Sequence, residues 1–475
     1  MIRNILVIMG VFVCLGGCSL APKYQQPGIP ISETWPQGEA YENTQAVSGI
    51  PTAQELNWQD FFTDQKLKKI IETALDNNRD LRIAVLNVEK ARAQYGVRRA
   101  ELFPAVDASG AWTKQRRSKD LIDPEESRTV EQYSADLGIA SWEIDFFGRI
   151  RSLKDQALEE YMATEQACRS AQIALISEVA RAYLTLAADK ESLNLARFTF
   201  KSQQDSYNLI LGNYQIGLAT RIDLRRAQTQ ADVAQRDVQR YIQLAAQDRN
   251  ALNLLAGTQV PDAMLPVDLG SVPPVSEISA GLSSRVLLNR PDIVAAEHRL
   301  KGAYAFIGAA RAAFFPRISL TASMGTASDE LSGLFGAGSG TWNFAPRIAM
   351  PIFDPRIWAA LRVSKADRKI ILAEYEKTIQ TAFRETADAL AVQGTIDRQV
   401  AAQESIVDAT TETYSLSNER YNLGIDGYLS VLDAHRSLYA QQQTLISLQL
   451  AKTANQITLY AVLGGGGRPF QSTKL

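Results

Sequence analysis

The first feature of the sequence is a helical spacing of apolar positions that covers most of its length. Apolar residues recur at intervals of three and four, as in Ile176, Val179, Tyr183 and Leu186. The spacing predicts helical stretches at about residues 64–103, 149–257, 282–315 and 356–463. The second and fourth are interrupted by glycine-containing turns, near residues 212–220 and 424–427. An unbroken helix over residues 149–211 would be roughly 90 Å long at about 1.5 Å per residue, far longer than a typical globular helix.

Strict alternation of apolar and polar residues replaces this spacing in four shorter segments. They cover residues 105–116, 131–147, 317–324 and 342–352. In the third, Ile318, Leu320 and Met324 alternate with hydroxyl-bearing residues. Alternation of this kind predicts strands with one apolar face and one polar face. Such a strand suits a wall between lipid and a watery lumen.

The order helix, hairpin, long helix, turn and helix occurs twice. Matched residues support the repetition: Asn77, Asp80, Arg99, Phe103 and Pro104 in the first copy, and Asn289, Asp292, Arg311, Phe315 and Pro316 in the second. We therefore predict an internal duplication. The predicted parts are a first repeat at residues 61–257, a proline-containing linker at 258–283, a second repeat at 284–463 and a loose tail at 464–475.

Two hairpins per chain are too few to close a barrel in a membrane. An open sheet edge would leave backbone donors and acceptors unpaired in lipid. Three such chains would supply about 12 strands, which is enough for closure. The pattern therefore predicts a trimeric 12-stranded β-barrel, about four strands per chain, continued by long helices. A soluble four-stranded sheet is the simpler alternative, but it must bury Trp112, Trp142 and Trp342 in a core that the helices do not obviously supply.

The N-terminus carries an export signal. Arg3 precedes a short apolar run that is followed by Leu15-Gly16-Gly17-Cys18. This resembles the lipobox of bacterial lipoproteins, which implies cleavage after residues 1–17 and acylation of Cys18. Several acyl chains would anchor the protein firmly, at roughly 0.8 kcal/mol per buried methylene. In such lipoproteins an Asp after the cysteine favours retention in the inner membrane. This chain has Ser19 at that position, so the outer membrane is a possible destination. Residues 18–60, with several prolines, are expected to form an extended N-terminal tether.

Composition removes several functional classes. The chain has 475 residues, with 50 Lys and Arg against 52 Asp and Glu, so it lacks the basic excess typical of nucleic-acid binding. Its two histidines, His298 and His435, are far apart in sequence and predict no metal site. No phosphate-binding loop is present. We expect no catalytic residue, no metal, no cofactor and no disulfide framework.

At this point the chain resembles a known family, the TolC-type outer-membrane factors, in the lipidated OprM/NodT-like branch that serves RND efflux systems. The motifs are the lipobox, the Phe-Pro helix stops, Trp142-Glu-Ile-Asp-Phe-Phe-Gly-Arg149 and Asn289-Arg-Pro-Asp-Ile293. The resemblance implies an α+β homotrimer whose β-barrel lies in the bacterial outer membrane and whose α-helical barrel extends into the periplasm. It also implies a periplasmic adaptor and an inner-membrane pump of the RND class as partners.

The two interrupting turns resemble the periplasmic tips of that family. In the first turn the resemblance assigns adaptor docking to Gly217, Leu218 and Thr220, and in the second to Gly424, Ile425 and Asp426. It places Leu429 and Asp433 in an apolar ring and a carboxylate ring around the aperture. Three carboxylates on a threefold axis would attract cations.

Asp223 and Tyr421 stand where TolC locks its closed tip. This chain departs from TolC at one position, because Asp426 stands where TolC has the basic partner of the lock. Arg221 could replace that basic residue. Helix capping is the alternative role for these tip residues.

Three functions fit these patterns. The first is the exit duct of a tripartite efflux pump for drugs or other small toxic compounds, which the duplication, tips and hairpins favour. The second is a type I secretion duct of the same fold. The third is a non-porous structural envelope lipoprotein. The sequence does not identify the substrate, the adaptor or the pump.

Overall fold

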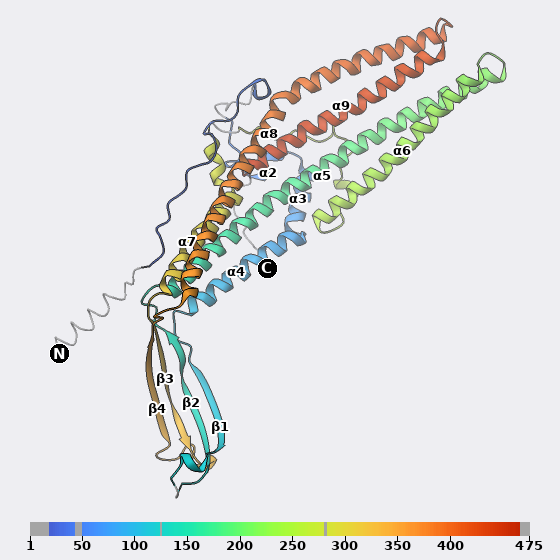
Figure 1. Ribbon diagram of the computed structural model, residues 1–475. Helices are drawn as coiled ribbons and strands as arrows, with labels where there is room; N and C mark the ends of the chain where they lie inside the picture. Colours follow the sequence, from blue (N-terminus) through green and yellow to red (C-terminus); the bar gives the residue numbers. More distant parts are fainter. Residues whose placement is uncertain (1–18, 43–49, 124–125, 280–282, 466–475) are drawn as a thin grey trace. The chain divides into compact units, whose positions relative to one another are not determined.

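The computed structural model describes residues 19–42, 50–123, 126–279 and 283–465, and Figure 1 labels their helices and strands. The predicted signal peptide, Cys18 and residues 466–475 of the predicted tail lie outside the described residues. The chain divides into two units, which are considered separately. We call them the sheet unit (Met1–Gly28, Asn87–Glu165 and Ala295–Tyr375) and the tip unit (Ile29–Leu86, Gln166–Val294 and Glu376–Leu475).

The elements follow the predicted order twice. The first half contains α2 (Trp58–Phe61), α3 (Gln65–Asn77), α4 (Arg79–Ala100), β1 (Asp107–Arg116), β2 (Thr129–Glu143), α5 (Arg149–Gln215) and α6 (Arg221–Ala256). The second contains α7 (Pro291–Ala312), β3 (Arg317–Ser328), β4 (Gly340–Ala349), α8 (Pro355–Asn422) and α9 (Tyr428–Val462). Short 3-10 turns lie between several of these elements. Within the described residues, none of the helices combines the length and apolar character that crossing a bilayer requires.

The first predicted helix is two helices in the structure. Asn78 ends α3 with an extended backbone, at φ −62° and ψ 131°. Its side-chain oxygen accepts a hydrogen bond from the Leu81 backbone N–H at 2.9 Å, which caps the start of α4. Its side-chain nitrogen donates to the Leu255 carbonyl, also at 2.9 Å. A contact with a residue so distant in sequence explains why the helical spacing alone missed the break.

The sheet unit contains one antiparallel sheet in the order β1-β2-β3-β4. Its register places apolar residues opposite one another on one face, as in Trp112↔Tyr133, Leu137↔Met324, Met324↔Trp342 and Ile318↔Ile348. The other face carries the alternating polar residues, such as Ser323 opposite Asn343. A register shift between Ile139 and Trp142 keeps both of these residues on the apolar face. The predicted two-faced sheet is therefore present, and β1 and β4 are its edge strands.

The N-terminal segment runs along helices in both units. In the sheet unit, Arg311 donates to the Leu20 carbonyl at 2.9 Å, and the Tyr24 hydroxyl donates to Glu297 at 3.0 Å. In the tip unit, Trp35 stacks on Phe383 with ring centroids 5.6 Å apart. Within the predicted tether, residues 19–38 contain no helix or strand, and they contact α7 and α8.

The main apolar core lies in the tip unit. Phe61 stacks on Tyr460 with ring centroids 4.1 Å apart, and both side chains are fully buried. The Tyr460 hydroxyl donates to the Leu56 carbonyl at 3.0 Å, so burial leaves this polar group satisfied. Residues from α2, α3, α5, α6, α8 and α9 contribute to this core, which holds the bases of the two helical hairpins together.

Candidate functional site: the helical tips

Each helical hairpin of the tip unit turns on a glycine. Gly217, between α5 and α6, has φ 83°, and Gly424, between α8 and α9, has φ 71°. A Cβ at either position would meet no atom within 4 Å, so the requirement for glycine comes from the backbone angle and not from space. The duplication therefore reproduces the same turn geometry in both halves.

The hydrogen bonds of the two turns are also alike. The Leu218 N–H donates to the Asn213 carbonyl at 2.8 Å, and the Ile425 N–H donates to the Arg420 carbonyl at 2.9 Å. Each bond reaches back five residues and closes a Schellman motif around the glycine. Leu218 and Ile425 are consequently directed outward, with 77% and 58% of their surface exposed.

Thr220 and Asp223 form a capping box at the start of α6. The Asp223 N–H donates to Thr220 Oγ1 at 3.2 Å, and the Thr220 N–H donates to Asp223 Oδ2 at 3.2 Å. The Thr220 hydroxyl also donates to Asp223 Oδ2, at 2.5 Å. Within the protomer the Asp223 carboxylate is thus engaged by its own helix end, which is the capping role considered from the sequence.

Asp426 pairs with a residue of its own hairpin. Arg420 donates from Nε to Asp426 Oδ2 at 2.6 Å and from Nη2 to Oδ1 at 3.1 Å. The Arg420 guanidinium lowers the pKa of Asp426. The sequence pattern did not identify Arg420 as this partner, because the two residues become neighbours only when α8 turns back at Gly424.

Tyr421 connects the two hairpins. It shares a hydrogen bond with the Asn213 side chain of α5, and its ring lies 5.4 Å from that of Tyr428. Burial raises the pKa of Tyr421, and the charge of the nearby Asp223 adds to this effect. An apolar cluster lies beneath, consisting of Ile210, Leu224, Ala227, Tyr428, Val431 and Leu432. The structure therefore brings Asp223 and Tyr421 into one neighbourhood, although their side chains have different hydrogen-bond partners.

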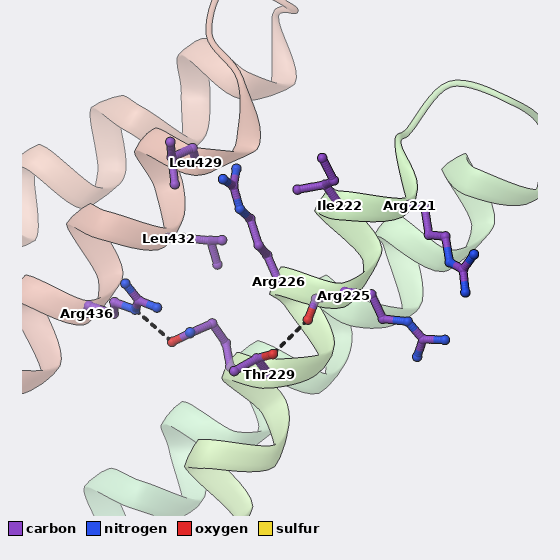
Figure 2. A pocket seen from close by; sticks show the side chains of 9 residues that line it. Arg221, Ile222, Arg225, Arg226, Thr229, Leu429, Leu432 and Arg436 are labelled. Atoms are coloured by element: carbon purple, nitrogen blue, oxygen red, sulfur yellow. Dashed lines mark hydrogen bonds between the residues drawn. The ribbon is translucent and has the colours of Figure 1, made fainter.

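Leu429 and Asp433 have different surroundings. Leu429 is 46% exposed and lines a pocket of about 630 Å³ between the beginnings of α6 and α9 (Figure 2). Asp433 faces Arg436, with 3.6 Å between Oδ1 and Nη1, and both side chains are mostly exposed. An exposed pair at this distance contributes little to stability.

Four arginines line the pocket, and of these the sequence pattern had drawn attention only to Arg221. They are Arg221, Arg225, Arg226 and Arg436. Figure 2 shows the Arg226 side chain reaching into the space between α6 and α9, close to Leu429. Three arginines within the first six residues of α6 were the available signal in the sequence, but only the packing of α6 beside α9 adds the fourth.

Comparisons with known proteins find relatives that match nearly the whole chain. The family model of outer membrane efflux proteins matches residues 70–258 and again residues 282–465, in agreement with the predicted duplication. A toluene efflux pump outer membrane protein, TtgC of Pseudomonas putida, is 46% identical over 98% of this chain and 96% of its own length. The outer membrane protein OprJ of Pseudomonas aeruginosa is 39% identical over 96% of this chain and 94% of its own length.

Solved structures agree with this assignment. The open state of the MtrE outer membrane channel of Neisseria gonorrhoeae has a TM-score of 0.85 and 38% identity, covering 95% of this chain and 99% of that one. The predicted fold class, a trimeric outer-membrane β-barrel with four strands per chain continued by long helices, is confirmed, as is the outer-membrane location. The chain belongs to the family of outer membrane efflux proteins.

Proposed function

We propose that this protein is the outer-membrane exit duct of a tripartite pump that exports small organic toxicants. The observation that carries the proposal is the sheet, whose one apolar face, one polar face and two open edges suit a share of a water-filled barrel. The duct performs no chemistry, so it needs neither catalytic residues nor a cofactor.

The cargo is proposed from the named activities of relatives. TtgC is a toluene efflux pump protein, ArpC of Pseudomonas putida is an antibiotic efflux pump protein at 46% identity, and SrpC of the same species is a solvent efflux pump protein at 45% identity. Aromatic solvents and antibiotics are therefore the first compounds to test as substrates of this chain.

The partners are a periplasmic adaptor that docks on the tips and an inner-membrane pump of the RND class. Exposed apolar side chains at both turns support the docking surface: Ile216, Leu218, Ile222, Leu423 and Ile425. A cluster of large apolar residues on a turn is unfavourable in water and is typical of a protein interface. The predicted docking residues Gly217, Thr220 and Gly424 shape this surface, and Asp426 adds a charged group beside it.

Cys18 is proposed as the acylated residue. Leu20, two residues later, is bound by Arg311, and Ala21 lies against Gly308. Both contacts are at the end of α7 just before β3, within the sheet unit. An extended residue spans about 3.3–3.6 Å, so an acyl chain on Cys18 would begin near the end of the sheet, where lipid is expected.

Leu429 and Asp433 are proposed to line the aperture of the duct. The exposure of Leu429 at the beginning of α9 supports this role, since an apolar side chain there can exclude water when three copies meet. The lock role of Asp223 and Tyr421 requires contacts from a neighbouring protomer, in addition to the capping box and the Asn213 bond described above.

Deletion of the gene and site-specific crosslinking test the function together. Loss of the chain should make the host more sensitive to toluene and to antibiotics, and the wild-type gene should restore resistance. A photocrosslinking residue at Leu218 should capture the adaptor, whereas one at Leu254 should not. Leu254 is a matched control because it is equally exposed, at 77%, at the other end of α6.

Two outcomes would contradict the proposal. Unchanged sensitivity accompanied by loss of a secreted protein would favour the type I secretion duct. Purified protein that carries no current in a planar bilayer would favour the non-porous structural lipoprotein.

A further inference from the structure

The pocket beside Leu429 has an unusual balance of charge. Four guanidinium groups line it, and none of its lining residues in the described part of the chain is Asp or Glu. Within the described residues, no hydrogen bond or ion pair engages the side chain of Arg221 or of Arg226. Arg225 donates to Gln228 at 2.5 Å, a neutral partner that leaves its charge uncompensated. The first turn of α6 adds the positive end of a helix dipole.

Arg436 is held in place at this pocket. Its Nε donates to the Gln230 side-chain oxygen at 3.1 Å, and Gln230 is only 8% exposed. Asp433 Oδ1 lies 3.6 Å from Arg436 Nη1 and balances one of the four charges. The pocket therefore presents a net positive charge on a partly preorganised support, which lowers the cost of binding an anion.

The remaining wall of the pocket is apolar. Leu429 and Leu432 come from α9, and Ile222 comes from α6. In Figure 2 the Arg226 guanidinium lies between Leu429 and Ile222, so a charged group and apolar surface face the same space. A ligand that carries a ring beside a carboxylate or sulfonate would use both surfaces at once.

We propose that the pocket between α6 and α9 recognises amphipathic organic anions, with Arg226 and Arg436 binding the acidic group and Leu429, Leu432 and Ile222 contacting the apolar part. The proposal rests on the exit-duct function and defines a substrate class for the tip. A volume of about 630 Å³ accommodates a compound of two or three rings. The arginines would also favour anions over cations near the aperture, in opposition to the Asp433 carboxylates.

Single-channel currents of the purified full-length protein test this proposal. The probe is 1-naphthalenesulfonate, and 1-naphthalenemethanol is its uncharged analogue. The sulfonate, added on the side of the tips, should block the current at a concentration roughly tenfold lower than the alcohol. The Arg226→Gln/Arg436→Gln double variant should need roughly tenfold more sulfonate for the same block. Its reversal potential in a salt gradient should also shift toward cation preference.

Arg197→Gln is the matched control, because Arg197 is an exposed arginine of α5 outside the pocket. The Arg197 variant should be blocked by the sulfonate at the same concentration as the parent. The Arg226→Lys/Arg436→Lys double variant, which keeps both positive charges, should retain part of the sulfonate block. Equal block by the alcohol and the sulfonate would overturn the proposal. Unchanged block in the Gln/Gln variant would overturn it too.

Equilibrium dialysis separates this proposal from the duct function. It measures sulfonate binding to the same protein without any conduction. A parent that binds the sulfonate through Arg226 and Arg436 but carries no current would keep the recognition site and refute the duct. If the parent protein carries current but does not bind the sulfonate, the duct function stands and the proposed anion site is refuted.

Discussion

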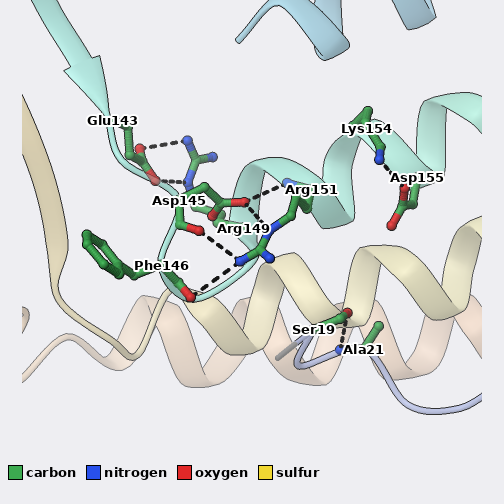
Figure 3. A network of polar contacts seen from close by, with 9 residues as sticks. All are labelled: Ser19, Ala21, Glu143, Asp145, Phe146, Arg149, Arg151, Lys154 and Asp155. Carbon is green, nitrogen blue, oxygen red and sulfur yellow. Dashed lines mark hydrogen bonds and ion pairs between the residues drawn. The ribbon is translucent and has the colours of Figure 1, made fainter. Parts of the chain in front are cut away.

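Arg149, the first residue of α5, makes a two-pronged ion pair with Glu143, the last residue of β2. Arg149 Nε donates to Glu143 Oε1 and Nη2 donates to Oε2, both at 2.8 Å (Figure 3). Beside this pair, Asp145 accepts from the Arg151 backbone N–H at 2.8 Å and from Arg151 Nε at 3.2 Å. The connection from strand to helix is thus fixed by charged groups within the Trp142–Arg149 motif and the residues that follow it.

Glu143→Gln should destabilise this joint. The change removes the charge of a partly buried acceptor, whose side chain is 20% exposed, and leaves Arg149 with a weaker partner. We expect a loss of about 1–3 kcal/mol in the free energy of unfolding. A lower melting temperature of the detergent-solubilised protein measures it. Glu126→Gln, an exposed acid of the β1–β2 connection, is the control and should melt like the parent. Equal melting of the Glu143 variant would show that the pair adds no net stability.

Two carboxyl groups meet inside the tip unit, and they predict a pH dependence. Asp248 of α6 shares a hydrogen bond with Asp189 of α5, and its Oδ2 is buried without a hydrogen-bond partner. Burial and the adjacent Asp189 raise the pKa of Asp248 from 3.8 to about 7. The folded state favours the protonated form, so this contribution to stability is complete below pH 3.8 and is lost as the pH rises through about 7.

Asp248→Asn should therefore stabilise the protein at pH 8. Solvent screening limits the gain to about 1 kcal/mol, or about 1 °C in melting temperature for a chain of this length. The difference from the parent should shrink at pH 5, where the parent carboxyl is already protonated. Asp232→Asn, an exposed substitution on the same helix, should show no such pH-dependent gain. A gain of the same size at both pH values would rule out titration of this pair.

Cys18→Ala should abolish incorporation of a radioactive fatty acid. The lipobox motivates this prediction, and the contacts of Leu20 and Ala21 with the end of α7, just before β3, support the proposed anchor. Labelling of the immunoprecipitated protein measures it. Cys168→Ala is the control, because Cys168 lies within α5 and should not affect labelling. Continued labelling of the Cys18 variant would move the modification to another residue.

Leu429→Ala should raise single-channel conductance, because a smaller side chain at the beginning of α9 leaves a wider opening when three copies meet. Asp433→Ala should shift the reversal potential in a salt gradient toward anions, since it removes a carboxylate while Arg436 remains. Leu416→Ala is the control for conductance: Leu416 is 51% exposed, but it lies on α8 outside the pocket. If the conductance of the Leu429 variant equals that of the parent, this residue does not limit the aperture.

The sequence by itself determined the repeated elements of this protein. Alternation across residues such as Ile318, Leu320 and Met324 predicted the two-faced strands, and spacing by three and four predicted the helices. Both signals are periodic and local, so they can be recognised without knowing which distant segments pack against each element. Gly217 and Gly424 could be assigned to turns for a similar reason, because a positive φ depends on the residue's own backbone. Two open sheet edges then required further copies of the chain.

Tertiary structure decided which side chains meet. The helix break at Asn78 depends on its hydrogen bond to Leu255. The carboxyl pair joins Asp189 of α5 to Asp248 of α6, and the spacing of apolar residues in these helices does not predict that contact. Asp426 found its partner in Arg420 only through the turn between α8 and α9. The arginine pocket required α6 and α9 to lie side by side, which brings Arg226 close to Leu429. Such contacts depend on three-dimensional packing between distant segments, and no period along the chain encodes them.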